Sequence, residues 1–218
     1  MAVMTRRRRR ARLDRLTLGL AAMAGATTIA VVAAEVGRVW RRGSAPLPQE
    51  SENLLAAAEE AMVETAEVAL AGYQQVSEWE NAMFNLFGSF VATLSLTRWI
   101  TRLLRGRRTL GPFRNVYLGR RHIHHFVPGI ALAFVSGAAA VVVKDESIRP
   151  RLAVPLGIGM GLTIDESALL LELDDVYWTP EGVVGLQIAL AATATLGTVA
   201  LGLRFLRRGE EIVLAEPR

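Results

Sequence analysis

The sequence predicts an all-α protein: a polytopic transmembrane helix bundle with about five spanning helices and one amphipathic extramembrane helix. Two observations carry this prediction. The hydrophobic fraction is 51% and the mean hydropathy is +0.29, both high for a soluble chain of 218 residues. The apolar residues also gather in stretches of about 18 to 24 residues, the length of a helix that spans a bilayer core of roughly 30 Å.

Five apolar stretches are the predicted spanning helices. Each must be helical, because lipid offers no hydrogen-bond partner to free backbone N–H and C=O groups. In chain order they are residues 16–36, 82–103, 126–143, 152–173 and 183–205. The third and fourth stretches are predicted to form a hairpin over the short loop 144–151.

The basic residues predict the orientation. Arginines crowd residues 1–15 and residues 98–121, whereas Lys144 is the single lysine. Because cytoplasmic loops of membrane proteins are enriched in Lys and Arg, both segments are predicted to be cytoplasmic. The bias toward arginine over lysine fits a GC-rich bacterial genome, so the expected location is a bacterial inner membrane. Five crossings then leave Arg204, Arg207 and Arg208 on the outer side, against this rule. A re-entrant fourth stretch would return them to the cytoplasm, so both topologies stay open.

Composition also divides the chain into segments. The basic run before the first apolar stretch is interpreted as part of an uncleaved anchor rather than a signal peptide. The predicted segments are a basic cytoplasmic tail (1–15), a first transmembrane helix (16–42), an acidic extracytoplasmic helical segment (43–80), a four-helix transmembrane core (81–206) and a C-terminal tail (207–218).

Residues 50–80 are rich in glutamate and contain no lysine or arginine. Their apolar residues recur at helical spacing, at Leu55, Met62, Ala66, Ala69, Tyr73 and Val76. This pattern predicts an amphipathic helix that runs on toward the second apolar stretch. The helix either covers the protein's own outer loops or binds a protein partner or a second copy of the chain.

All three histidines, His122, His124 and His125, directly precede the third apolar stretch. The fourth stretch carries three carboxylates, Asp165, Glu166 and Glu172. If the third stretch runs outward and the fourth returns, the histidines and carboxylates lie at one level on adjacent helices, in the cytoplasmic leaflet. Ionisable residues within a spanning helix are costly and therefore suggest a functional site.

Imidazole and carboxylate groups together suit Zn, Fe or Mn. The predicted ligands of this divalent metal site are His122, His124, His125, Asp165, Glu166 and Glu172. Arg98, Asn85 and Asp175 are candidate supporting residues. In the alternatives, the histidines lie at lipid headgroups or pair with the carboxylates, or the cluster relays protons.

Two further patterns concern helix packing. Asn81, Asn85, Ser89, Thr93 and Thr97 form a polar stripe that either packs against other helices or lines a wet path. Small residues recur every fourth position in the third stretch (Gly129, Ala133, Gly137) and in the fourth (Gly157, Gly161). This spacing predicts close packing of the third helix on the fourth.

The remaining features exclude some functions. The absence of cysteine excludes thiolate ligands and a cysteine nucleophile. No phosphate-binding loop is present, and the expected partners of the arginines are membrane lipids rather than nucleic acid. Three functions stay open: a structural or accessory protein that binds a divalent cation, a metal-dependent enzyme acting on lipid or an embedded substrate, and a cation or proton transport element.

The stretches HIHHFVPGI and GLTIDESALLLELDDVYW resemble a group of bacterial, mostly actinobacterial, integral membrane proteins that have no characterised activity. The resemblance covers roughly residues 115 to 190 and rests on these two stretches. It implies that the two stretches form one site, and it implies no catalytic role for any residue.

Overall fold

The structure of the protein is a computed structural model. It describes residues 2–51, 53–104, 125–165 and 180–214, with 109–110, 113–114, 117–118 and 121–122 between them. The helices in these ranges are α1 (Ala2–Arg42), α2 (Leu54–Gln75), α3 (Glu78–Leu104), α4 (Phe126–Val142), the 3-10 turn η1 (Glu146–Ile148), α5 (Arg149–Asp165) and α7 (Pro180–Val213). Four two-residue strands, β1 (Thr109–Leu110), β2 (Phe113–Arg114), β3 (Tyr117–Leu118) and β4 (Arg121–His122), pair antiparallel as β1–β2 and β3–β4. Each strand is only two residues long and helices make up nearly all of the described residues, so the all-α prediction is confirmed.

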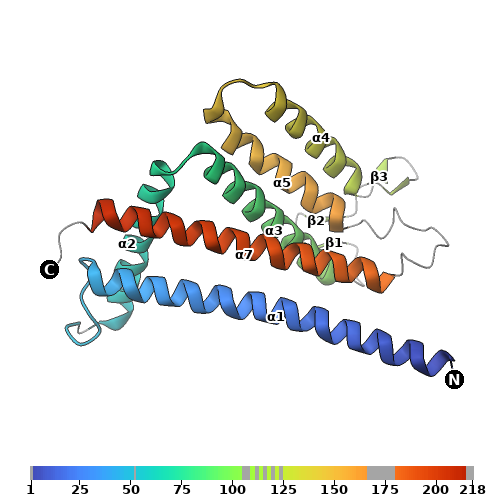
Figure 1. The fold of residues 1–218 in the computed structure, drawn as a ribbon, viewed down its shortest axis with the longest axis horizontal. Helices are drawn as coiled ribbons and strands as arrows, with labels where there is room; N and C mark the ends of the chain where they lie inside the picture. Colours follow the sequence, from blue (N-terminus) through green and yellow to red (C-terminus); the bar gives the residue numbers. More distant parts are fainter. Residues whose placement is uncertain are drawn as a thin grey trace.

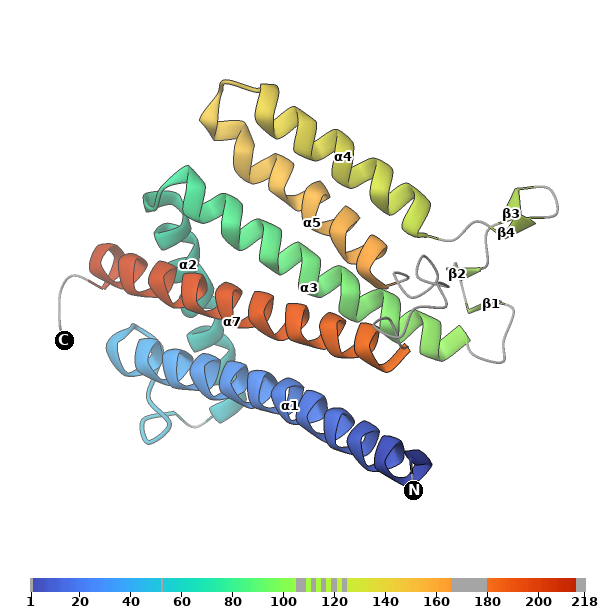
Figure 2. The same ribbon diagram turned by 45° about the vertical axis from the view of Figure 1, so that its right-hand side comes forward.

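Apart from α2, the α-helices lie side by side in one row, in the order α1, α7, α3, α5, α4 (Figures 1 and 2). A helix in a single row has at most two neighbours, so much of its surface stays uncovered. Large apolar side chains occupy these surfaces: Ile29 and Phe134, for example, are 72% and 76% exposed. Apolar surface on this scale is unusual in a soluble monomer and favours a lipid environment.

Contacts along the helices fix their relative directions. Helices α1 and α7 run parallel: Thr28 and Thr198 line one cavity, and farther along both helices Glu35 pairs with Arg207. Helix α3 runs opposite to α7, with Glu80–Arg204 contact at one end and Arg98–Gln187 contact at the other, and Figure 1 shows α5 parallel to α3 and α4 antiparallel to it.

The row therefore has two ends. The end where α3 and α5 finish and α1, α4 and α7 begin is called the His125 end. The opposite end, where α2 packs across α7 and α1, is called the α2 end (Figure 2).

Two helical segments are long and apolar enough to cross a membrane. They are Gly19–Arg42 in α1 and Leu186–Val213 in α7, with mean hydropathies of 1.6 and 1.7. Only 11% of each apolar window is buried, whereas the core helix of a soluble protein is mostly buried. The prediction of about five spanning helices was too high for the clearly spanning helices among the described residues. Helix α4 is apolar but only 17 residues long, and the polar stripe lowers the hydropathy of α3.

Helix α5 lies between α3 and α4, and its glycines face both neighbours. A Cβ at Gly157 or Gly161 would overlap atoms of α3, whereas a Cβ at Gly159 would overlap the α4 backbone at Ala133. The predicted close packing of the third stretch on the fourth is therefore confirmed, but on the fourth stretch it is made by Gly159 and not by Gly157 and Gly161. Residues two apart lie about 200° apart on a helix, so Gly159 alone of the three turns toward α4.

The buried face of α2 differs from the predicted one. Leu55 is 84% exposed and Met62 is 59% exposed, although both belong to the predicted apolar face. The buried positions are instead the small residues Ala57, Ala61, Val68 and Gly72. At Val68 and Gly72 a large side chain has no room, because α2 crosses α7 there at very close range.

Two glycines form the crossing of α2 and α7. A Cβ at Gly72 would overlap the carbonyl oxygen of Phe205, and a Cβ at Gly209 would overlap the carbonyl oxygen of Val68. Beside the crossing, the Phe205 ring lies 5.5 Å from the Tyr73 ring and 5.0 Å from the Phe84 ring. This aromatic cluster ties α2 and α7 to the start of α3.

Helix α2 does not run on into α3, in contrast to the prediction. Ser77 and Glu80 form a capping box at the start of α3: Ser77 N donates to Glu80 Oε2 at 3.1 Å, and Glu80 N donates to Ser77 Oγ at 3.3 Å. The extended backbone of Val76 separates the two helices.

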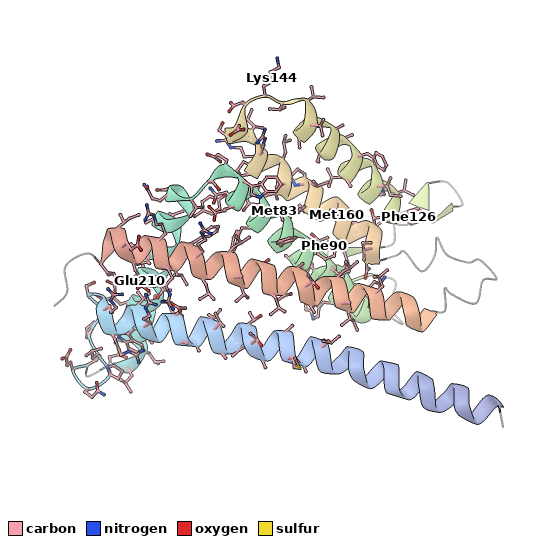
Figure 3. All side chains as sticks on the ribbon, viewed as in Figure 1. Met83, Phe90, Phe126, Lys144, Met160 and Glu210 are labelled. Atoms are coloured by element: carbon pink, nitrogen blue, oxygen red, sulfur yellow. The ribbon has the colours of Figure 1, made fainter. Side chains whose placement is uncertain are left out.

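The predicted hairpin between the third and fourth stretches is confirmed. Asp145 begins η1, and its side chain accepts hydrogen bonds from Ser147 N at 3.0 Å and Ser147 Oγ at 2.8 Å. The hydrogen bond from the Ser147 side chain holds the pKa of Asp145 below its usual value. Lys144 projects from the tip of the hairpin at the α2 end (Figure 3).

Candidate functional site

A polar cluster joins four segments at the His125 end. Arg98 of α3 donates from Nε to Asp165 Oδ1 at the last residue of α5, and from Nη2 to the side-chain oxygen of Gln187 in α7. His125, the residue before α4, places Nε2 at 3.2 Å from Asp165 Oδ2. The Gln187 side-chain nitrogen donates to the carbonyl oxygens of Ile164 and Asp165. We call Arg98, His125, Asp165 and Gln187 the Asp165 cluster.

The carboxylate of Asp165 lies at the centre of the cluster. Its side chain is 6% exposed, whereas those of Arg98 and His125 are 30% and 32% exposed. A buried carboxylate is costly unless it is paired, and here one oxygen faces Arg98 of α3 and the other faces His125, the residue before α4. The cluster therefore neutralises its own charge while it links α3, α4, α5 and α7.

The structure brings together only some of the predicted site residues. His125 and Asp165 are in contact, which agrees with the prediction that the third and fourth stretches present them at one level. The predicted supporting residue Arg98 joins them. His122 lies in β4 opposite Tyr117, and its side chain is not described. His124, Glu166, Glu172 and Asp175 lie outside the described residues.

Asn85 lies far from this cluster. Its side-chain nitrogen donates to the Tyr73 hydroxyl and to the Pro150 carbonyl oxygen, both at 2.9 Å, toward the α2 end. It joins α3 to α2 and α5 there. Two further residues of the polar stripe also serve packing, since Ser89 and Thr93 lie directly against the glycines of α5.

Within the part of the chain that the structure describes, no group of three or more His, Cys, Asp or Glu side chains is arranged to hold a metal ion. Of the six predicted ligands, only His125 and Asp165 have described side chains. An imidazole and a carboxylate in contact are two suitable ligands for a divalent metal, and a complete coordination shell needs others.

A second charged network lies at the α2 end. Glu210 of α7, with a side chain 2% exposed, accepts from Arg38 Nη2 and from Arg42 Nη1, the latter at 2.8 Å. Arg207 Nη2 donates to Glu35 Oε1 of α1 at 2.9 Å. Figure 3 shows Glu210 where the final turns of α1 and α7 meet. We call these five residues the Glu210 network.

Five crossings would leave Arg204, Arg207 and Arg208 on the outer side, and the structure shows how their charges are compensated there. Arg207 pairs with Glu35, Arg204 pairs with Glu80 at 2.7 Å, and Arg208 pairs with Glu211 at 2.7 Å. Each of the three arginines therefore has a carboxylate partner within the protein.

Sequence reasoning missed Gln187 and Glu35. Both had a detectable signal, because each is a strongly polar residue within an apolar stretch and must find a partner inside the protein. Glu210 gave no such signal, since it follows the last apolar stretch among other charged residues.

Comparison with known proteins adds no family or function. No protein-family model, curated protein or solved structure matches the chain significantly.

Proposed function

We propose that this protein is a five-crossing membrane protein with a cytoplasmic N-terminus, in a bacterial inner membrane. We further propose that its role is structural or accessory, with the acidic helix α2 presented to a partner on the outer side. The observation that carries the proposal is the pair of charged layers, the Asp165 cluster and the Glu210 network, at opposite ends of the helix row.

The distance between these layers supports membrane crossing. On α3, Glu80 pairs with Arg204 at the α2 end, and Arg98 belongs to the Asp165 cluster at the His125 end. At 1.5 Å per residue, about 18 residues of helix separate them by roughly 27 Å, close to the bilayer core of roughly 30 Å. No residue of α3 between them carries a formal charge.

Two exposed tryptophans mark the same levels. Trp79 is 65% exposed and Trp99 is 57% exposed, next to Glu80 and Arg98 respectively. Tryptophan is enriched at both interfaces of a membrane, where its ring sits at the headgroups. These positions support α3 as a spanning helix. Because α5 covers the polar stripe, the average hydropathy of α3 is lower than the hydropathy of the surface that faces lipid.

The parallel arrangement of α1 and α7 supports further crossings. Two helices that cross a membrane in the same direction require an odd number of crossings in the chain between them. Helices α3, α4 and α5 alternate in direction and supply three. At 17 residues each, α4 and α5 reach the short limit of roughly 17 to 25 residues for a spanning helix.

Cysteine labelling tests this topology directly, because the chain contains no cysteine. Single variants Gln49→Cys, Lys144→Cys and Glu211→Cys are expected to react with a membrane-impermeant maleimide in intact cells. Thr5→Cys is expected to react only after permeabilisation. Labelling in detergent controls for cysteine reactivity. An unreactive Lys144→Cys in intact cells would show that the α4–α5 hairpin does not cross.

The structural role follows from the Asp165 cluster. Both oxygens of Asp165 contact basic groups of the protein, so the carboxylate serves here to join helices. The negative charges that a partner could contact lie on α2, where Glu59, Glu60 and Glu67 are exposed. Glu64 is different, because its carboxylate accepts a hydrogen bond from Ser44 Oγ at 3.0 Å. An acidic outer surface of this kind suits a basic partner segment.

Charge reversal tests the partner role. The triple variant Glu59→Lys/Glu60→Lys/Glu67→Lys is expected to abolish a discrete cross-linked species that the wild type forms in native membranes. Glu146→Lys, an exposed reversal on the hairpin at the same end, is the matched control and should retain it. If the species persists in the triple variant, or is absent from the wild type, α2 is not a docking surface.

A divalent-cation site is the second candidate function, favoured by the contact between His125 and Asp165. Under this proposal His122 and the carboxylates beyond Asp165 complete the ligand set. Elemental analysis of the purified protein is expected to give near-stoichiometric Zn, Fe or Mn, lost in the double variant His122→Ala/His125→Ala. A wild type without these metals would leave the histidines as pairing or interfacial residues.

A further inference from the structure

An apolar cavity of about 490 Å³ lies between α1 and α7, closed in part by α2 and α3. Its size is within the range of roughly 300 to 1,000 Å³ that is usual for small-molecule sites. Its lining is almost wholly apolar, with Val32 of α1, Leu70 of α2, Phe84 of α3 and Leu203 of α7 as examples. Neither the Asp165 cluster nor the acidic surface of α2 involves this cavity.

Three of the polar side chains that line the cavity already have partners. Thr28 and Thr198 donate their hydroxyl protons to the backbone of their own helices, at 2.8 and 2.9 Å. The Tyr73 hydroxyl accepts from Asn85. A bound water needs two to four polar partners, so these groups make a poor site for water.

The fourth polar side chain, Glu35, can accept a further hydrogen bond. The residue is 6% exposed, and Oε1 accepts from Arg207. The other oxygen, Oε2, is buried and has no hydrogen-bond partner among the described residues. An unsatisfied buried acceptor costs free energy, so a ligand that donates a hydrogen bond to it gains affinity.

The surroundings of Glu35 select the charge of that donor. Arg207 Nη2 lies at 2.9 Å from one carboxylate oxygen, and Arg38 Nη1 lies at 3.9 Å from the other. The Glu210 network as a whole holds three guanidinium groups against two carboxylates, so its net charge is positive and a further cation would be repelled. A neutral hydroxyl can donate to Oε2 without this repulsion.

We propose that the cavity binds the hydrocarbon chain of an amphiphile with an uncharged hydroxyl head group, such as a long-chain alcohol or a monoglyceride, whose hydroxyl donates to Glu35 Oε2. The chain occupies the apolar space between α1 and α7, and the head group lies toward the α2 end. The polar groups that would fix the head group are few and the apolar surface is large, as is typical of small-molecule sites.

Photo-crosslinking of the full-length protein in lipid nanodiscs tests the proposal. The probe is hexadecanol with a diazirine in its chain, compared with the methyl ether and the primary amine of the same chain. The hydroxyl probe is expected to label residues 28–36 and 198–206. Labelling by the ether is expected to be about tenfold lower, as for loss of a hydrogen bond to a charged group. Equal labelling by the ether, or stronger labelling by the amine, would overturn the head-group assignment.

Two variants separate the cavity from general lipid contact. Gly202 lines the cavity, and Gly202→Leu is expected to block labelling by filling it; Gly25→Leu on α1, where a Cβ meets open space, is the matched control that retains labelling. Glu35→Gln is expected to reduce the preference for the hydroxyl probe without changing the folded state, as judged by size-exclusion chromatography. Undiminished labelling in a folded Gly202→Leu protein would show that the probe binds outside the cavity.

Discussion

Asp165→Ala is expected to destabilise the helix assembly by about 2 to 3 kcal/mol, because removing one partner of a buried ion pair leaves the other uncompensated. The expected loss is below the roughly 3 to 5 kcal/mol of a fully buried pair, since the Arg98 side chain is 30% exposed. The midpoint of thermal unfolding in detergent, followed by size-exclusion chromatography, measures the effect.

A double-mutant cycle separates the ion pair from other effects of the substitution. Adding Arg98→Gln to the Asp165 variant is expected to cost little more, because the guanidinium has already lost its carboxylate. Asp145→Ala, which removes an exposed capping carboxylate at η1, is the matched control and should lower the thermal midpoint much less than Asp165→Ala does. Additive losses at Asp165 and Arg98 would argue against the pairing.

Gly72→Ala is expected to destabilise the protein by about 3 kcal/mol, at the upper end of the usual range for overpacking. The new methyl group would overlap the backbone carbonyl of Phe205, which cannot move as a flexible side chain can. Helix α2 should then separate from α7. A fall in the thermal midpoint, together with proteolysis within residues 54–75, measures this result.

Substitutions at two other glycines serve as comparisons for this prediction. Gly209→Ala places its methyl group on the Val68 carbonyl and should behave like Gly72→Ala. Gly25→Ala meets nothing within 4 Å and should leave stability unchanged or slightly improved, because alanine favours a helix over glycine. Equal midpoints for the Gly72 and Gly25 variants would show that α2 does not pack closely on α7.

The sequence predicted the positions of the helices well, because apolar length is a local property. Each of the five apolar stretches overlaps a described helix, and the hairpin around Asp145 lies where its short polar loop indicated. Which helices lie next to each other was harder to predict from the sequence. Nothing in the order of the stretches indicates that α7 lies between α1 and α3, and the exposed face of α2 was misjudged because glycine and alanine, not the larger apolar residues, determine how closely helices approach.

The candidate site was predictable in part. Counting residues from the hairpin set His125 and Asp165 at one depth, and Arg98 followed as the nearest basic residue on a neighbouring stretch. Gln187 was missed because its role depends on α7 lying next to α3, which is a tertiary fact. The Glu210 network was missed for the same reason, since each of its carboxylates pairs with an arginine from the opposite end of the chain.

The pairing of α1 with α7 also constrains how the protein is made. Glu35 and Arg207 are 172 residues apart in the chain. At a synthesis rate of about 5 to 20 residues per second, the first helix waits roughly 10 to 30 s for the last one to emerge. Throughout that interval Glu35 lacks its final partner, as do Arg38 and Arg42, which wait for Glu210. A nascent chain stopped before Arg207 would therefore hold an unfinished first helix that a quality-control protease or a membrane chaperone could recognise by its unpaired charges.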